Sequence, residues 1–175
     1  MATAITTPVT VEQFVCLDLP EGREWELHDG EIVDMGEPSP KHRRIQRQIS
    51  RILERLFPNA DVLFEYGFRI EKSVRSADVG VVISKDRVSD DLLEGAPELV
   101  VEVLSPSNTV KALKEYRRLC FANGTQVFLT VDSDDQTVQV HVKGETDGHT
   151  YGAKEQISIE LFGATITVAV AEIFG

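Results

Sequence analysis

A glutamate inside an almost wholly apolar segment constrains this chain more than any other feature. Residues 99–104 have the sequence Leu-Val-Val-Glu-Val-Leu, which is typical of a central strand that is covered on both faces of its sheet. An ionised carboxylate is costly in such a place unless it is paired with a cation or binds a metal. Glu102 therefore needs a partner that the fold brings to it.

A second acidic residue lies at the start of another predicted strand, residues 77–83. Asp78 is followed there by Val79-Gly80-Val81-Val82. Two carboxylates at strand positions can converge at one end of a sheet, and hard oxygen ligands of this kind suit Mg²⁺ or Mn²⁺. The same residues also allow a structural arrangement in which Asp78 caps a turn and Glu102 pairs with an arginine.

Hydrophobic periodicity and turn signals predict an α/β (α+β) order of elements. An Asp29-Gly30 turn predicts a hairpin of strands 25–28 and 31–33, and Ser39-Pro40 begins a long helix. The other predicted strands are 62–70, 77–83, 99–104, 126–131, 137–142, 149–151, 156–160 and 164–168, with helices at 11–17 and 109–122. Because strand 126–131 returns after a helix, it should pair in parallel. We expect a mixed sheet flanked by helices, with additional C-terminal strands.

Length and composition fit one globular domain. The chain has 175 residues, of which 42% are hydrophobic, enough for one core. No apolar run approaches the roughly 20 residues that span a bilayer, and residues 1–10 lack the features of a signal peptide. We therefore expect a single cytoplasmic domain over residues 1–175, with a flexible segment 1–8 and no membrane association.

The charge distribution is uneven. The formal net charge of -11 opposes non-specific binding to nucleic acid. Within the first long helix, however, Arg44, Arg47, Arg51 and Arg55 recur every three or four residues and form a stripe opposite the apolar face. This stripe could contact a phosphate backbone, and an ordinary solvated helix face is the alternative.

Several motifs, in the same order along the chain, resemble one protein family. Residues 25–33 resemble its ELxDGExV segment, residues 39–42 its SPxH motif, and residues 77–79 its PDV motif with alanine for proline. Residues 95–107 match GAPDLVVEVLSPS almost letter for letter, and residues 122–124 and 131–132 match a later helix end and strand end. The resemblance covers about residues 10–142 and is to the Uma2 family of the PD-(D/E)XK nuclease superfamily, whose fold is restriction endonuclease-like.

The resemblance implies a metal-dependent endonuclease that hydrolyses phosphodiester bonds in DNA, often as a homodimer. Asp78 and Glu102 would hold the Mg²⁺ or Mn²⁺ ion, the Val103 carbonyl would be a third ligand, and Glu26 and His42 would line the same site. The helical spacing of His42 from the apolar stripe also places it on the inward face. A core histidine and a surface strand glutamate are the alternatives for His42 and Glu26.

The chain departs from the family at the catalytic lysine, which supports the nucleophile or stabilises developing charge. An alignment without gaps between the SPS turn and residues 122–124 places Tyr116 at that position. A tyrosine hydroxyl is neutral and weakly acidic. Another cation could serve, of which Arg117 is the nearest in sequence, or the site is slow or inactive.

Three hypotheses therefore stay open from the sequence. The first is an endonuclease in which Asp78, Glu102, Glu26, His42 and Tyr116 form the active site. The second is a catalytically impaired nuclease-fold protein that binds nucleic acid or acts as a regulatory homodimer. The third is a structural homodimer without a ligand. For any dimer, the C-terminal strands and residues 169–174 are the expected surface.

Overall fold

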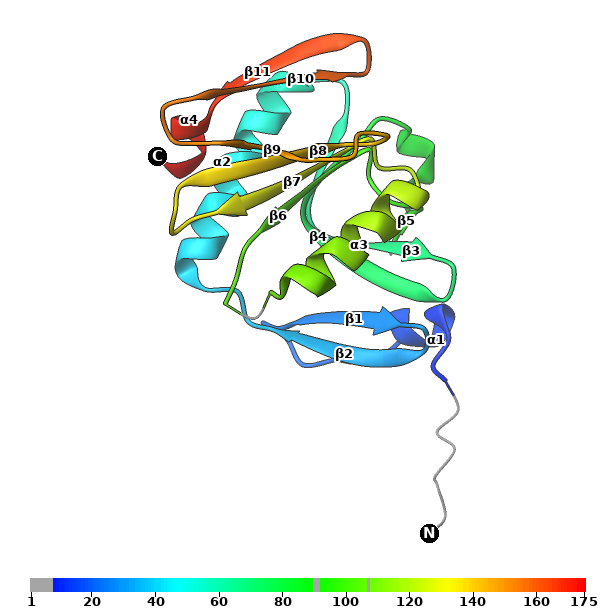
Figure 1. Ribbon diagram of the computed structural model, residues 1–175. Coiled ribbons are helices and arrows are strands. Elements are labelled where there is room, and N and C mark those ends of the chain that lie inside the picture. Colours follow the sequence, from blue (N-terminus) through cyan, green and yellow to red (C-terminus); the bar gives the residue numbers. More distant parts are fainter. Residues whose placement is uncertain (1–7, 90–91, 107) are drawn as a thin grey trace.

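A large mixed sheet carries the residues of interest. The computed structural model describes residues 8–89, 92–106 and 108–175 (Figure 1). Its elements in chain order are α1 (Val11–Val15), β1 (Glu24–His28), β2 (Glu31–Gly36), α2 (Pro40–Leu56), β3 (Asp61–Ile70), β4 (Ser73–Val82), η1 (Lys85–Arg87), β5 (Leu93–Glu94), β6 (Leu99–Val103), α3 (Val110–Ala122), β7 (Val127–Asp132), β8 (Thr137–Val142), β9 (His149–Tyr151), β10 (Gln156–Leu161), β11 (Ala164–Ala169) and α4 (Val170–Phe174). In the sheet, the described strands follow the order β2-β1-β4-β6-β7-β8-β9, with β3 and β5 attached through β4. Strands β10 and β11 form a separate hairpin.

The main predicted elements and the fold class are confirmed. Strands β1 and β2 pair antiparallel around a turn whose two residues, Asp29 and Gly30, both have positive φ, as expected of an Asp-Gly hairpin. Helix α2 begins at Pro40 after the N-cap Ser39, and strands β6 and β7 pair in parallel across α3. None of the helices in the described part of the chain is long and apolar enough to cross a membrane.

Three details differ from the sequence-based expectation. Strand β4 begins at Ser73 rather than at residue 77, because residues 73–76 are polar apart from Val74 and give no apolar run. The short elements β5 and α4 were not predicted. The expected flexible segment 1–8, apart from Pro8, and Ser107 of the turn before α3 lie outside the described residues. That the chain is one domain stays a prediction.

Helix α4 at the C-terminus packs part of its surface on the protein's own core. Val170 and Ile173 of α4 are buried in the cluster that includes the apolar stripe of α2. On the outside, Arg55 pairs with Glu172 at 2.7 Å, and Gln48 donates to the Glu172 carbonyl. That the C-terminal strands and residues 169–174 form a dimer surface stays a prediction, with Val170 and Ile173 taken up by the protein's own core.

The sheet lies between two helical layers (Figure 1). One face packs against α2, α4 and the β10–β11 hairpin, and its core includes Ile49 of α2 and Val101 of β6. The other face packs against α3, and its core includes Tyr116, Val100 of β6 and Phe128 of β7. Since both faces are covered, any charged group inside the sheet is removed from bulk water.

Strands β3 and β4 share a break in their alternation. On β4, Ala77 packs in the cluster under α3, whereas Val79, only two residues on, packs in the cluster under α2. Regular alternation would put residues two apart on the same face. The register places Glu65 of β3 opposite Asp78 at this point, and Glu65 has a φ of 48°, which non-glycine residues rarely adopt. The break therefore takes Asp78 out of the regular pleat.

Candidate metal and nuclease site

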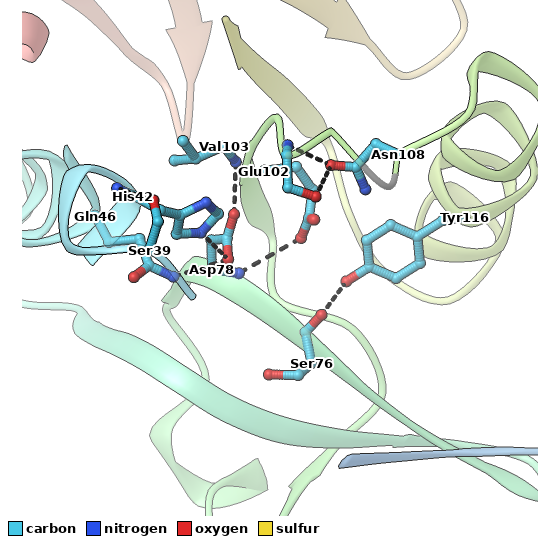
Figure 2. A network of polar contacts seen from close by, with 10 residues as sticks. Ser39, His42, Gln46, Ser76, Asp78, Glu102, Val103, Asn108 and Tyr116 are labelled. Carbon is cyan, nitrogen blue, oxygen red and sulfur yellow. Dashed lines mark hydrogen bonds and ion pairs between the residues drawn. The ribbon is translucent and has the colours of Figure 1, made fainter. Parts of the chain in front are cut away.

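Asp78 and Glu102 lie opposite each other where strands β4 and β6 stop pairing. The antiparallel ladder ends at Val79 and Val101, so the next pair would be Asp78 and Glu102. Side chains take the place of that missing rung: the Asp78 N–H donates to Glu102 Oε1 at 3.4 Å, and the Val103 N–H donates to Asp78 Oδ2 at 2.5 Å (Figure 2). The two carboxylates thus bridge what we call the β4–β6 gap.

Helix α2 holds the other oxygen of Asp78. His42 Nε2 lies 3.0 Å from Asp78 Oδ1, and Gln46 Nε2 donates to the same oxygen at 2.8 Å (Figure 2). Burial lowers the pKa of His42, but the hydrogen bond and charge of Asp78, together with neighbouring glutamates, raise that pKa above its ordinary value overall. The predicted inward position of His42 is confirmed, and its partner is the carboxylate of Asp78.

Glu102 is half-buried and has no ion-pair partner among the described residues. Burial and, next, the charge of Asp78 raise the pKa of Glu102 well above its ordinary value. Asp78 itself lies inside β4 and caps no turn. The structural alternative, a turn cap at Asp78 and an arginine pair at Glu102, is therefore wrong. A covered carboxylate whose ionisation is opposed by burial and by a neighbouring carboxylate is typical of functional sites.

Glu26 is buried in a second network beside the acidic pair. It is 3% exposed, and its Oε1 accepts from the Ser76 N–H at 2.8 Å. Its Oε2 accepts from Arg75 Nε at 2.8 Å and lies 2.5 Å from His28 Nε2. The alternative of a surface glutamate is wrong, because Glu26 satisfies an amide on the edge of β4 that no neighbouring strand pairs with.

Tyr116 is on the face of α3 that covers the sheet, and its side chain reaches the same edge of β4. Its hydroxyl donates to the Ser76 carbonyl at 2.7 Å (Figure 2), and Arg75 Cζ stands 4.6 Å above the centre of its ring. Arg117, the cation nearest in sequence to the lysine position, lies 2.7 Å from His141 Nε2. The arginine beside the Tyr116 ring is Arg75, which no sequence pattern indicated because the predicted strand began at residue 77.

Three buried oxygen atoms near Asp78 have no hydrogen-bond donor within the described structure. They belong to Glu24, Gln46 and Glu65. Burial raises the pKa of Glu24 to about 7, and the charges of Asp78 and Glu65 add to this shift. No sequence signal identified Glu24 or Glu65, because both look like ordinary strand carboxylates. An excess of acceptors in a covered place favours the binding of a cation.

A cleft of about 440 Å³ opens beside the acidic pair, and its lining includes Glu24, His42 and Val103. At its outer side, Lys41 and Asp134 form an ion pair of 2.6 Å. Among the described residues, no group of three or more His, Cys, Asp and Glu side chains is arranged to hold a metal. The carboxylates that line the cleft itself are those of Glu24, Glu37 and Asp134, and the acidic pair lies behind His42 and Val103.

The arginine stripe of α2 lies next to this cleft. Arg44, Arg47 and Arg51 are exposed and line a second hollow of about 590 Å³. Glu37 and Pro38 line both the hollow and the cleft, so the two are continuous along the surface. Arg55, the last member of the predicted stripe, is engaged with α4 instead.

The mixed sheet, its helical layers and an acidic pair at a strand edge define a restriction endonuclease-like protein. A family model described as "Putative restriction endonuclease" (Uma2) matches residues 11–171. The chain therefore belongs to the Uma2 family, and the match extends beyond the motifs into the C-terminal strands.

A solved structure has the same fold. It is a "putative nuclease" of the DUF820 family from Anabaena variabilis, with a TM-score of 0.79 and 21% sequence identity, covering 95% of this chain and 98% of that one. No curated protein matches the sequence. The similarity of structure thus supports the fold over nearly the whole chain.

The pKa of Glu24 predicts a pH-dependent cost to stability. Below its ordinary pKa of 4.5 the carboxyl is protonated in both the folded and the unfolded state. As the pH rises from there to about 7, the unfolded state loses its proton first, so the free energy of unfolding falls. We expect Glu24→Gln to raise that free energy by about 1–2 kcal/mol at pH 8, discounted for partial solvent exposure, with little gain at pH 4.5.

Urea unfolding at the two pH values measures this difference. Glu115→Gln, at an exposed side chain of α3, is the matched control. A gain in Glu24→Gln that is equal at both pH values, or equal to that of the control, would show that Glu24 is not held in its protonated form.

Proposed function

We propose that this protein is a divalent-metal-dependent endonuclease that hydrolyses phosphodiester bonds in DNA. The observation that carries the proposal is the side-chain bridge between Asp78 and Glu102 across the β4–β6 gap. His42 and Val103, which contact Asp78, line the adjacent cleft. Membership of the Uma2 family supports the nuclease class. The metal, the reaction and the DNA substrate are the proposed parts.

The donor set fits a hard divalent cation such as Mg²⁺ or Mn²⁺. An ionised carboxylate has about four acceptor positions. Asp78 uses three of them, for His42, Gln46 and the Val103 N–H, so that one remains on Oδ2. Within the described structure, Glu102 accepts one hydrogen bond, from the Asp78 N–H. Asp78 and Glu102 would hold the ion, with the Val103 carbonyl as the third ligand.

In the proposed reaction, the oxygen of a water molecule forms a bond to phosphorus, and the bond from phosphorus to one ester oxygen breaks. The proton lost by the water ends on the leaving alcohol. The bound ion would supply Lewis acidity and lower the pKa of water. The chain's own residues orient the site: His42 and Gln46 fix Asp78, and Glu26 and Tyr116 fix the strand edge at Ser76.

The arginine stripe supports a path for the DNA backbone. Arg44, Arg47 and Arg51 are exposed on one face of α2 and have no carboxylate partner among the described residues. Cationic side chains of this kind contact phosphates and release counterions. The hollow that they line joins the acidic cleft at Glu37 and Pro38, so a strand bound there could reach the acidic pair. A homodimer stays a prediction.

Binding of Mn²⁺ tests the metal part of the proposal without a choice of substrate. We expect calorimetry to show one site in the native protein, and Asp78→Asn and Glu102→Gln each to weaken binding by more than about tenfold, because each removes a ligand charge while keeping the side-chain shape. Glu115→Gln is the control for general attraction of cations to an acidic protein. Equal affinities in all four proteins would contradict the assignment.

The salt dependence of DNA binding tests the arginine stripe. If Arg47 contacts a phosphate, Arg47→Ala should reduce the slope of log K against log salt by about 1. Arg118→Ala, at an exposed arginine of α3, should leave the slope unchanged. Fluorescence anisotropy with a labelled duplex, without divalent metal, measures both. Equal slopes for Arg47→Ala and the native protein would mean that the stripe is an ordinary solvated helix face.

A nucleic-acid-binding protein without turnover is the second candidate function. The observation in its favour is Tyr116, which occupies the position of the family's lysine and carries no positive charge. In that case Mn²⁺ and DNA would both bind, but a plasmid incubated with Mn²⁺ and the protein would stay intact. Cleavage that is lost in Asp78→Asn would exclude this alternative.

A further inference from the structure

We propose that Arg75 supplies the positive charge of the site and binds a non-bridging oxygen of the substrate phosphate. This inference rests on the proposed nuclease function. Arg75 extends from β4, three residues before Asp78, and its guanidinium lies above Tyr116, the residue at the lysine position. The Tyr116 ring from α3 and the Arg75 guanidinium from β4 would together replace the lysine.

The guanidinium is fixed from two sides. Its Nε donates to Glu26 Oε2 at 2.8 Å, and the Arg75 side chain is 17% exposed. Glu26 is itself held by the Ser76 N–H at 2.8 Å. Below the guanidinium, the ring of Tyr116 lies 4.6 Å from Cζ, within the range of a cation–π contact. A cation held in this way loses little conformational freedom when it binds a ligand.

The ion pair with Glu26 leaves most donors of Arg75 available. A guanidinium carries five N–H donors in a planar fork, and the bond to Glu26 uses the one on Nε. Within the described structure, no hydrogen bond involves either terminal nitrogen of Arg75. The outer edge of the fork therefore presents four N–H donors, a geometry that matches two oxygens of a phosphate.

Three other cations near the cleft or on α3 are engaged elsewhere. Arg117 contacts His141, and Lys41 pairs with Asp134 at 2.6 Å. On α3, Lys111 points away to Glu115, with both side chains more than half exposed. These contacts make Arg75 the best-placed cation for a phosphate near Glu102.

Binding of inorganic phosphate to the Mn²⁺-loaded protein tests the proposal with a readout other than cleavage. We expect Arg75→Gln to bind phosphate about tenfold or more weakly than the native protein, the value of one charge-assisted hydrogen bond, while its Mn²⁺ affinity is retained. Arg69→Gln, at an arginine of β3 that pairs with Glu12, should behave as the native protein. Plasmid cleavage by Arg75→Gln should fall on the order of 100-fold, and adding Tyr116→Lys should restore part of it.

The outcomes separate this inference from the proposed function. Unchanged phosphate affinity in Arg75→Gln, or no phosphate binding by the native protein with or without Mn²⁺, would overturn the role of Arg75. If the native protein binds phosphate but no Mn²⁺, and Arg75→Gln loses phosphate, the metal proposal fails and Arg75 stands. Should Arg75→Gln not fold because Glu26 is left unpaired, the double variant Glu26→Gln, Arg75→Gln removes both charges and carries the same comparison.

Discussion

The candidate site depends on one missing rung in the sheet. Strands β4 and β6 stop pairing after Val79 and Val101, although both strands continue, and buried main-chain groups without partners are costly. The carboxylates of Glu102 and Asp78 accept hydrogen bonds from the Asp78 and Val103 amides, which lie beyond the last paired rung. The same two carboxylates thus serve the fold, as acceptors for these amides, and the proposed chemistry, as a pair of acidic groups.

The two sides of this bridge differ in their balance of charges. On the side of α2, Glu24 and Glu65 add acceptors that lack donors, so negative charge is in excess and a cation is favoured. On the side of α3, Glu26 and Arg75 balance each other at 2.8 Å. Under the proposed function, a phosphodiester that reaches Glu102 would meet the proposed cation site on one side and a guanidinium on the other, and groups of this kind stabilise charge in phosphoryl transfer.

Features that follow from local chemistry were predictable from the sequence. The Asp29-Gly30 turn fixed the first hairpin, Ser39 and Pro40 the start of α2, and the glutamate in an apolar strand led to the acidic pair. Features that depend on register were not: nothing local in the sequence places Asp78 across from Glu102. The break at Glu65 and Asp78 also has no sequence signature, since a positive φ at glutamate is set by its tertiary surroundings. Arg75 was not predicted for a related reason. It lies in the polar first part of β4, which pairs with neighbouring strands but has no apolar pattern that would predict a strand there.

The most direct measurement of the central claim is an anomalous difference map from crystals of the native protein soaked in MnCl₂. The account predicts a peak within about 2.5 Å of carboxylate oxygens of both Asp78 and Glu102, and its absence in crystals of Asp78→Asn treated identically. A peak that avoids both carboxylates, or no peak at a concentration at which calorimetry shows Mn²⁺ bound, would contradict the assignment of the β4–β6 gap as the metal site.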